Sequence, residues 1–169
     1  MPTIRPELPE DYPAVFEIHR RAFGRPEEAK LVEKLRTVAD PQISLVAVCE
    51  GDVVGHIFFS PVTIEGQPSS FQALGLAPMA VVPELQNQGI GSLLVKKGIK
   101  VAHSMGENIV VVLGHAEYYP RFGFKVASRI GLCCEFPASD EAFMVIELEP
   151  RALRGRSGIV KYLPEFSAV

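Results

Sequence analysis

The sequence predicts a single α/β domain, and three observations support this prediction. A chain of 169 residues is the size of one ordinary domain. Its composition, 47% hydrophobic and 22% charged, is that of a globular protein with a full core. Apolar residues recur at helical spacing near the N-terminus and form strand-like runs from residue 44 onward. Because no linker, internal repeat or charge block divides the chain, we expect one domain over residues 1–169.

The first part of the chain predicts a short strand and two helices. Residues 3–5 favour the strand, and Asp11 is a candidate N-cap for a helix that ends at Gly24. A second helix is expected to begin at Pro26. Acidic residues in its first turn and basic residues in its last turn complement the helix dipole.

The middle of the chain predicts a hairpin and then a long, interrupted strand. Residues 44–49 and 53–60 flank a tight turn, and a second turn is expected around Gly66. The next strand, 71–82, contains Pro78, which cannot donate to a strand ladder and indicates a bulge or a local loss of pairing. The alternative is that Pro78 lies on an edge of the sheet. A break there would separate two strands and free backbone groups for a ligand.

The same periodicities predict the remaining elements. They are a helix over 89–105, a strand over 109–113, a helical turn over 117–122, and strands over 124–126, 143–148 and 157–162.

Composition argues against several classes of partner. Seventeen basic residues against 20 acidic ones give a net charge of -3, which disfavours nucleic acid and anionic membranes. The longest uncharged run, 66–83, is too polar to span a bilayer, and the N-terminus lacks the apolar region of a signal peptide. The three cysteines form no CxxC and lack zinc-ligand spacing. We therefore expect a cytoplasmic protein with free thiols, no metal, and no nucleic-acid or membrane partner.

The segment 79–92, MAVVPELQNQGIGS, predicts a strand, a loop and the start of a helix. Gly89 and Gly91 allow a sharp turn and a close approach to the backbone. The first N–H groups of the helix then point outward at the positive end of its dipole and form a phosphate cradle. The segment is neither a Walker A loop nor a GxGxxG motif. The alternative is a glycine-rich helix start that binds nothing.

A second motif follows one helix and one buried strand later. Residues 119–124, YPRFGF, match the pattern Tyr-x-x-x-Gly-Phe, and residues 86–91, QNQGIG, match [Gln/Arg]-x-x-Gly-x-[Gly/Ala]. With these two motifs the whole chain resembles the GCN5-related N-acetyltransferase (GNAT) superfamily, in particular a subgroup of small bacterial predicted acetyltransferases. The resemblance implies a mixed, mostly antiparallel twisted sheet flanked by helices, with a bulged fourth strand and a phosphate-binding strand-loop-helix.

The resemblance also implies that acetyl-CoA is the co-substrate. Backbone groups of Met79, Ala80, Val81 and Val82 would pair with the pantetheine arm, and one main-chain N–H would polarise the thioester oxygen. Gln86 replaces the family's common arginine and supplies no fixed charge. It would flank the residues that bind the pyrophosphate, which are Asn87, Gln88, Gly89, Ile90, Gly91 and Ser92.

Tyr119 matches the family's general acid, since a phenol with a pKa of about 10 can protonate a departing thiolate. The alternative is a tyrosine that only packs beneath the helix, and neighbouring Tyr118 is interpreted as a pocket wall. No acidic residue lies in 71–82 or 109–113 to act as the general base. His115 can relay a proton through water, although a lone loop histidine is more often simply solvated.

The resemblance implies direct transfer of acetyl from acetyl-CoA to an amine, either a small molecule or a peptide, and relatives in the family often form homodimers. Cys133 and Cys134 do not favour a covalent intermediate, because nothing places a base beside them. The acceptor pocket is expected around Phe16, Phe23, Phe58 and the loops before Phe143. The alternatives are a noncatalytic acyl-CoA-binding module on the same fold and a binder of another nucleotide.

Overall fold

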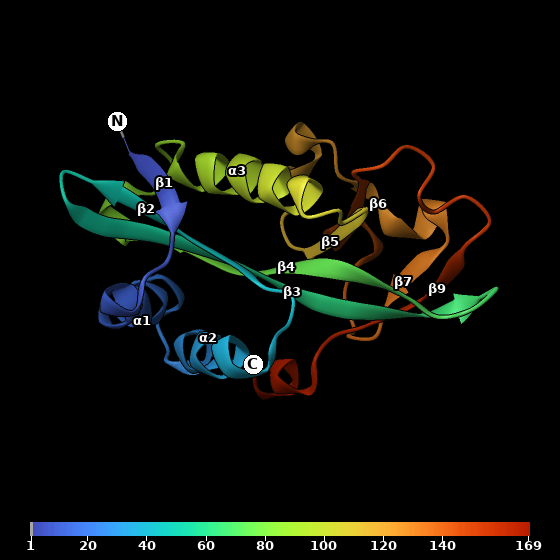
Figure 1. Cartoon of the computed structure of the whole chain (residues 1–169), viewed down its shortest axis with the longest axis horizontal. Helices are drawn as coiled ribbons and strands as arrows, with labels where there is room; N and C mark the ends of the chain where they lie inside the picture. Colours follow the sequence, from blue (N-terminus) through green and yellow to red (C-terminus); the bar gives the residue numbers. More distant parts are fainter. Residues whose placement is uncertain (1) are drawn as a thin grey trace.

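A nine-stranded sheet runs through residues 2–169, the part of the chain that the computed structural model describes (Figure 1). The strands are β1 (Thr3–Pro6), β2 (Ile43–Cys49), β3 (Asp52–Gln67), β4 (Phe71–Val81), β5 (Ile109–Leu113), β6 (Lys125–Val126), β7 (Leu132–Cys134), β8 (Phe143–Glu147) and β9 (Ser157–Lys161). The α-helices are α1 (Tyr12–Phe23), α2 (Glu27–Val38) and α3 (Ile90–Ser104). Short 3₁₀ turns are η1 (Pro9–Asp11), η2 (Pro83–Leu85), η3 (Tyr119–Phe122), η4 (Ala127–Ile130), η5 (Asp140–Ala142) and η6 (Pro164–Ala168).

The sheet is mixed and mostly antiparallel, as predicted. Its strands follow the order β1-β2-β3-β4-β5-β8-β6, and β9 pairs with β3 and β7. Two pairs are parallel, β4 with β5 and β7 with β9. The β4–β5 crossover contains α3, as a parallel connection requires.

Helices cover both faces of the sheet because side chains alternate along each strand. Ile57 and Phe59 of β3 pack in the cluster that contains the apolar residues of α3. Phe58, between them, packs in the opposite cluster with residues of α1 and α2. Figure 1 shows α3 on one side of the sheet and α1 and α2 on the other.

The predicted break in the fourth strand is present. Ile57 pairs with Met79, whereas Phe59 pairs with Leu76, so β4 carries one more residue than β3 at Ala77–Pro78. Pairing between β4 and β5 stops at Leu76, while β4 continues along β3 to Val81. The edge of β4 beyond the bulge therefore faces open space instead of a strand.

Two residues in β3 behave differently from the sequence prediction. Pro61 lies inside the strand, at the point where pairing with β2 has ended at Phe59 and pairing with β9 has not yet begun at Thr63. A missing N–H is tolerated there. Gly66 does not form the predicted turn, because it pairs with Gly158 of β9 so closely that a Cβ atom would overlap the backbone of Ser157. The strand continues to Gln67.

Two further features differ from the sequence prediction. Asp11 is the N-cap residue of α1, as predicted, but its side chain makes no capping hydrogen bond, because its carboxylate accepts hydrogen bonds from Arg5 and from the backbone N–H of Leu8. Arg5 lowers the pKa of this carboxyl group. The three-residue strand β7 has no counterpart in the predicted elements, because its short sequence shows no clear alternation.

Candidate functional site

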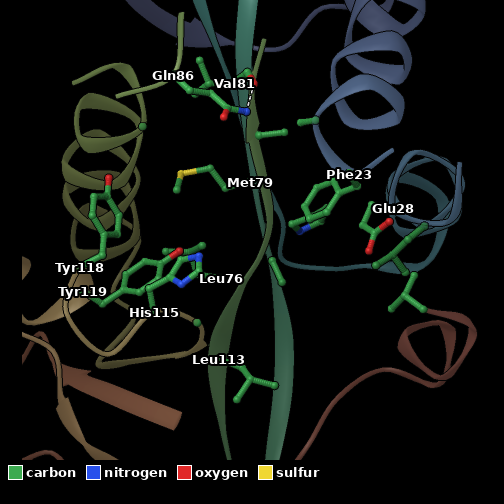
Figure 2. Close-up of a pocket in the computed structure, with 18 of the residues that line it drawn as sticks. Phe23, Glu28, Leu76, Met79, Val81, Gln86, Leu113, His115, Tyr118 and Tyr119 are labelled. Carbon is green, nitrogen blue, oxygen red and sulfur yellow. Dashed lines mark hydrogen bonds between the residues drawn. The ribbon is translucent and has the colours of Figure 1, made fainter. Parts of the chain in front are cut away.

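A cleft of ≈ 1180 Å³ opens where β4 and β5 part. Its floor is the edge of β4 from Leu76 to Val81. Figure 2 shows β4 between two groups of side chains: Tyr118, Tyr119 and His115 on one side, and Phe23 and Glu28 on the other. We call these the α3 side and the α1/α2 side of the cleft.

The α3 side begins at the N-terminus of α3. Gly89 is the N-cap residue and adopts the left-handed conformation, with φ +89°. The N–H of Leu93 makes the first helical bond, to the carbonyl of Gly89 at 3.1 Å. The N–H groups of Ile90, Gly91 and Ser92 precede that bond, so they lack a carbonyl four residues earlier within the helix. All three residues line the cleft and present the positive end of the helix dipole to it.

The structure brings most of the predicted cofactor residues to the cleft. Those that line it are Met79, Ala80, Val81, Gln86, Asn87, Gly89, Ile90, Gly91 and Ser92. Val82 and Gln88 do not line it. The N–H of Val82 donates to Val54, and the Gln88 amide donates to the carbonyl of Glu84 at 3.4 Å. The Gln86 amide donates to the carbonyl of Val81 at 3.0 Å and ties the loop back to β4 (Figure 2).

Tyr119 lies at the wall of the cleft with its ring in the core. The residue is 7% exposed and packs edge-on against Phe124, with ring centroids 5.6 Å apart. Gly114 allows this position, because a Cβ atom there would lie 2.6 Å from the Tyr119 ring. Burial raises the pKa of the Tyr119 phenol, so it stays protonated at neutral pH. Tyr119 therefore packs in the core and also lines the cleft.

Tyr118 and His115 complete the α3 side. The Tyr118 hydroxyl lies 3.0 Å from Oγ of Ser92, which joins η3 to the first turn of α3. The guanidinium of Arg121 lies 4.8 Å from the centroid of the Tyr118 ring. His115 is exposed and lines the cleft in the segment after β5. The predicted interpretation of Tyr118 as a pocket wall agrees with this placement.

The α1/α2 side holds residues that sequence patterns did not identify. Glu28 is 8% exposed, and its two carboxylate oxygens accept hydrogen bonds of 3.0 and 2.6 Å from Arg25. Three aromatic rings from the C-terminal part of the chain also line this side, those of Phe136, Tyr162 and Phe166. Acidic residues in a first helical turn are usually dipole partners, so Glu28 carried no separate signal.

Of the three phenylalanines expected around the acceptor pocket, Phe23 lines the cleft and the other two do not. Phe58 is fully buried, in the cluster with α1 and α2 residues. Its place in the middle of a continuous apolar strand directs it into the core. Phe16 does not reach the cleft from α1.

The remaining candidate groups lie away from the cleft. Cys133 and Cys134 belong to β7 and do not line it, and all three cysteines are free thiols. Across residues 2–169, no group of three or more His, Cys, Asp or Glu side chains is placed to hold a metal ion. In the same residues, no helix is both long and apolar enough to cross a membrane.

The family and the relative that match this chain are both described as N-acetyltransferases or acetyltransferases. A family described as an acetyltransferase (GNAT) domain matches residues 3–127. The curated Escherichia coli protein YhbS, described as an uncharacterised N-acetyltransferase, is 39% identical over 165 residues, which covers 97% of this chain and 98% of YhbS.

Two crystal structures are similar over nearly the whole chain. The E. coli YhbS structure, a complex with CoA, has a TM-score of 0.90 and 37% identity and covers 98% of this chain and 92% of its own. A GNAT family acetyltransferase from Brucella melitensis, in complex with acetyl-CoA, has a TM-score of 0.80 and 31% identity, with 98% of each chain covered. The bulged fourth strand, the glycine-capped helix start and these matches together show that the chain belongs to the GNAT family of acetyltransferases.

Proposed function

We propose that this protein is an acetyl-CoA-dependent N-acetyltransferase that moves an acetyl group directly to an amine. The observation that carries the proposal is the unpaired edge of β4, which opens beside the N-terminus of α3 in a single cleft. The two similar proteins crystallised with CoA and acetyl-CoA support this choice of cofactor.

Two parts of coenzyme A, the pantetheine arm and the pyrophosphate, have matching surfaces in the cleft. On the open edge of β4, the backbone groups of Met79 and the N–H of Val81 point away from β3 and suit the amides of the pantetheine arm, which pair like an added strand, whereas Ala80 faces His56 of β3. The outward N–H groups of Ile90, Gly91 and Ser92 suit the pyrophosphate. The proposal assigns no ligand contact to Val82 or to the Gln88 side chain, because neither lines the cleft.

The reaction uses three groups of the cleft: a backbone N–H of β4, the Tyr119 phenol and the His115 imidazole. The lone pair of a neutral amine attacks the thioester carbonyl, so a C–N bond forms and the carbonyl oxygen becomes negative. A backbone N–H on the β4 edge stabilises that oxygen. The C–S bond then breaks, its electron pair leaves with sulfur, and the Tyr119 phenol gives its proton to the thiolate. The proton lost from nitrogen passes to solvent through His115, an imidazole on the cleft wall, and a proton from solvent restores the Tyr119 phenol.

A covalent route through the enzyme is disfavoured. The only vicinal thiols, Cys133 and Cys134, lie outside the cleft, and burial raises the pKa of the Cys134 thiol. Direct transfer between the two bound substrates therefore suits the geometry better than a ping-pong reaction.

The first experiment is calorimetric titration of the purified protein with acetyl-CoA, with ATP and NAD as controls. We expect saturable binding to one site by acetyl-CoA alone. Thiol release is then measured in the presence of small-molecule and peptide amines. No binding at millimolar acetyl-CoA would contradict the proposal. Binding without thiol release for any amine would favour the alternative, a noncatalytic acyl-CoA-binding module.

A further inference from the structure

The α1/α2 side of the cleft carries a fixed charged group, the carboxylate of Glu28. Arg25 holds both oxygens of this carboxylate, at 3.0 and 2.6 Å, so the group is fixed in position. Each carboxylate oxygen has more than one lone pair, and an additional donor in the cleft can bind the same atoms. Figure 2 shows the Glu28 side chain directed toward the cleft on the side of β4 opposite Tyr119.

Arg25 does not neutralise this side of the cleft. Its guanidinium is half-exposed and also lies 3.9 Å from the carboxylate of Glu27. Two carboxylates therefore share one guanidinium, which leaves a net negative charge at the start of α2. A cation that enters the cleft is attracted to Glu28, whereas a carboxylate on a ligand is repelled.

The rest of this side is aromatic. Phe136, Tyr162 and Phe166 form a contiguous row of tilted rings, with centroid distances of 5.5 Å between the first two and 5.2 Å between the last two. Phe23 at the end of α1 adds a ring that is 42% exposed. Such rings pack well against a flat apolar group and offer few partners to hydroxyl groups or amides.

We propose that the acceptor is a cationic arylalkylamine: its ammonium is drawn in by Glu28 and its ring packs against the aromatic side chains of the α1/α2 side. This inference rests on the proposed function, since it names the class of amine that the same cleft accepts. The cleft binds the ammonium form of the amine from solution. The neutral amine, formed when the ammonium loses a proton, then attacks the thioester at the β4 edge. Amino acids are poor acceptors because their α-carboxylate would lie near Glu28.

The test uses three probe amines with the CoA-loaded protein. 2-Phenylethylamine carries both features, butylamine lacks the ring, and phenylalanine adds a carboxylate. We expect calorimetry to show the tightest binding for 2-phenylethylamine. In Glu28→Gln, which keeps the side-chain shape, its Kd should rise about tenfold or more, the loss expected for a hydrogen bond to a charged group.

Matched variants separate recognition from folding. Glu33 is exposed on the same helix, and Glu33→Gln should leave the Kd of 2-phenylethylamine unchanged. Glu28→Asp keeps the charge and should recover part of the affinity. Phe23→Ala should weaken 2-phenylethylamine but not butylamine. The Kd of acetyl-CoA, measured in every variant, should stay at the wild-type value and report that the fold is intact.

Two outcomes overturn the inference: Glu28→Gln binds 2-phenylethylamine as wild type does, or phenylalanine binds more tightly than 2-phenylethylamine. If other amines then release thiol, the proposed transferase function stands and only the acceptor class is wrong. If 2-phenylethylamine binds in a Glu28-dependent way but no amine releases thiol, the acceptor site is supported and the transferase function fails.

Discussion

The imidazole rings of His19 in α1 and His56 in β3 share a buried hydrogen bond, 2.8 Å from Nε2 of His19 to Nδ1 of His56. His56 also bonds through Nε2 to Oγ of Ser44 at 2.8 Å, and Ser44 donates to Glu7 at 2.8 Å. A carboxylate only accepts, so Ser44 must accept from Nε2 of His56. Burial lowers the pKa of both histidines, so both are neutral at neutral pH. Nδ1 of His56 then accepts from Nε2 of His19, and Nδ1 of His19 is a buried acceptor with no partner among the described residues.

This pair should make the protein unstable in mild acid. Burial and neighbouring His56 lower the pKa of His19 to about 2, and burial and Arg36 lower the pKa of His56 to about 3. In the unfolded chain both groups take up protons near pH 6.5, so stability is fully present above about that pH and falls as pH decreases toward 3. The slope from two such groups reaches roughly 3 kcal/mol per pH unit.

Urea unfolding between about pH 7.5 and 4.5 measures this slope. His19→Gln removes one of the two groups, so we expect its slope to be about half of the wild-type slope. His103→Asn changes an exposed histidine and should leave the slope unchanged. A wild-type protein equally stable at both ends of this range would show that the pair does not titrate on unfolding.

Tyr119→Phe should leave the affinity for acetyl-CoA nearly intact and lower turnover by roughly 100-fold or more, because it removes only the proton donor. Calorimetry and thiol release measure the two quantities separately. Tyr118→Phe is the matched control. It removes the hydroxyl that bonds Ser92, so it should affect cofactor binding more than turnover. Wild-type turnover in Tyr119→Phe would exclude the general-acid role.

Gly89→Ala should weaken acetyl-CoA binding about tenfold. A Cβ atom meets nothing within 4 Å there, but φ is +89°, a conformation that costs alanine roughly 1–2 kcal/mol. Gly106 ends the same helix with φ +87° and equally open surroundings. Gly106→Ala should therefore cost similar stability and leave the acetyl-CoA Kd unchanged. Equal affinities in the two variants and wild type would mean that the turn at Gly89 does not shape the cofactor site.

Gly98→Ala should destabilise the fold by about 1–2 kcal/mol, although alanine normally favours helices. The reason is that a Cβ atom at Gly98 overlaps the Phe59 ring, which packs against α3. Denaturant unfolding of Gly98→Ala, Phe59→Leu and the double variant measures the coupling between the two positions. We expect the double variant to lose less than the sum of the single losses, and strict additivity would contradict this contact.

Local signals account for most of the secondary structure. Pro78 marked the bulge because proline cannot donate in a ladder, and Gly89 marked the start of α3 because glycine allows a positive φ. Gly66 was misinterpreted because a glycine that forms a turn and a glycine that permits a close strand crossing look alike in one sequence. Only the pairing with β9, more than ninety residues later in the chain, distinguishes a glycine at a turn from a glycine at a close strand contact.

The α3 side of the cleft and its floor could be predicted because their residues are almost contiguous. The segment 79–92 forms the β4 edge, the loop and the start of α3, so the backbone conformation of one stretch builds the surface. The spacing of Tyr119 to Gly123 and Phe124 in its motif was likewise a local signal.

The α1/α2 side of the cleft was decided by tertiary structure. Glu28 resembles an ordinary first-turn acid, and Phe136, Tyr162 and Phe166 show no common spacing, yet all four line one cavity. The buried hydrogen bond between His19 and His56 likewise joins residues that lie far apart in the sequence. Hydrophobic periodicity states which side of an element is buried, but the partner that buries it is fixed by packing between segments far apart in the chain. The sequence by itself therefore determined most of the elements, the bulge and the glycine turn before α3, and the tertiary structure alone decided which distant side chains meet in the cleft.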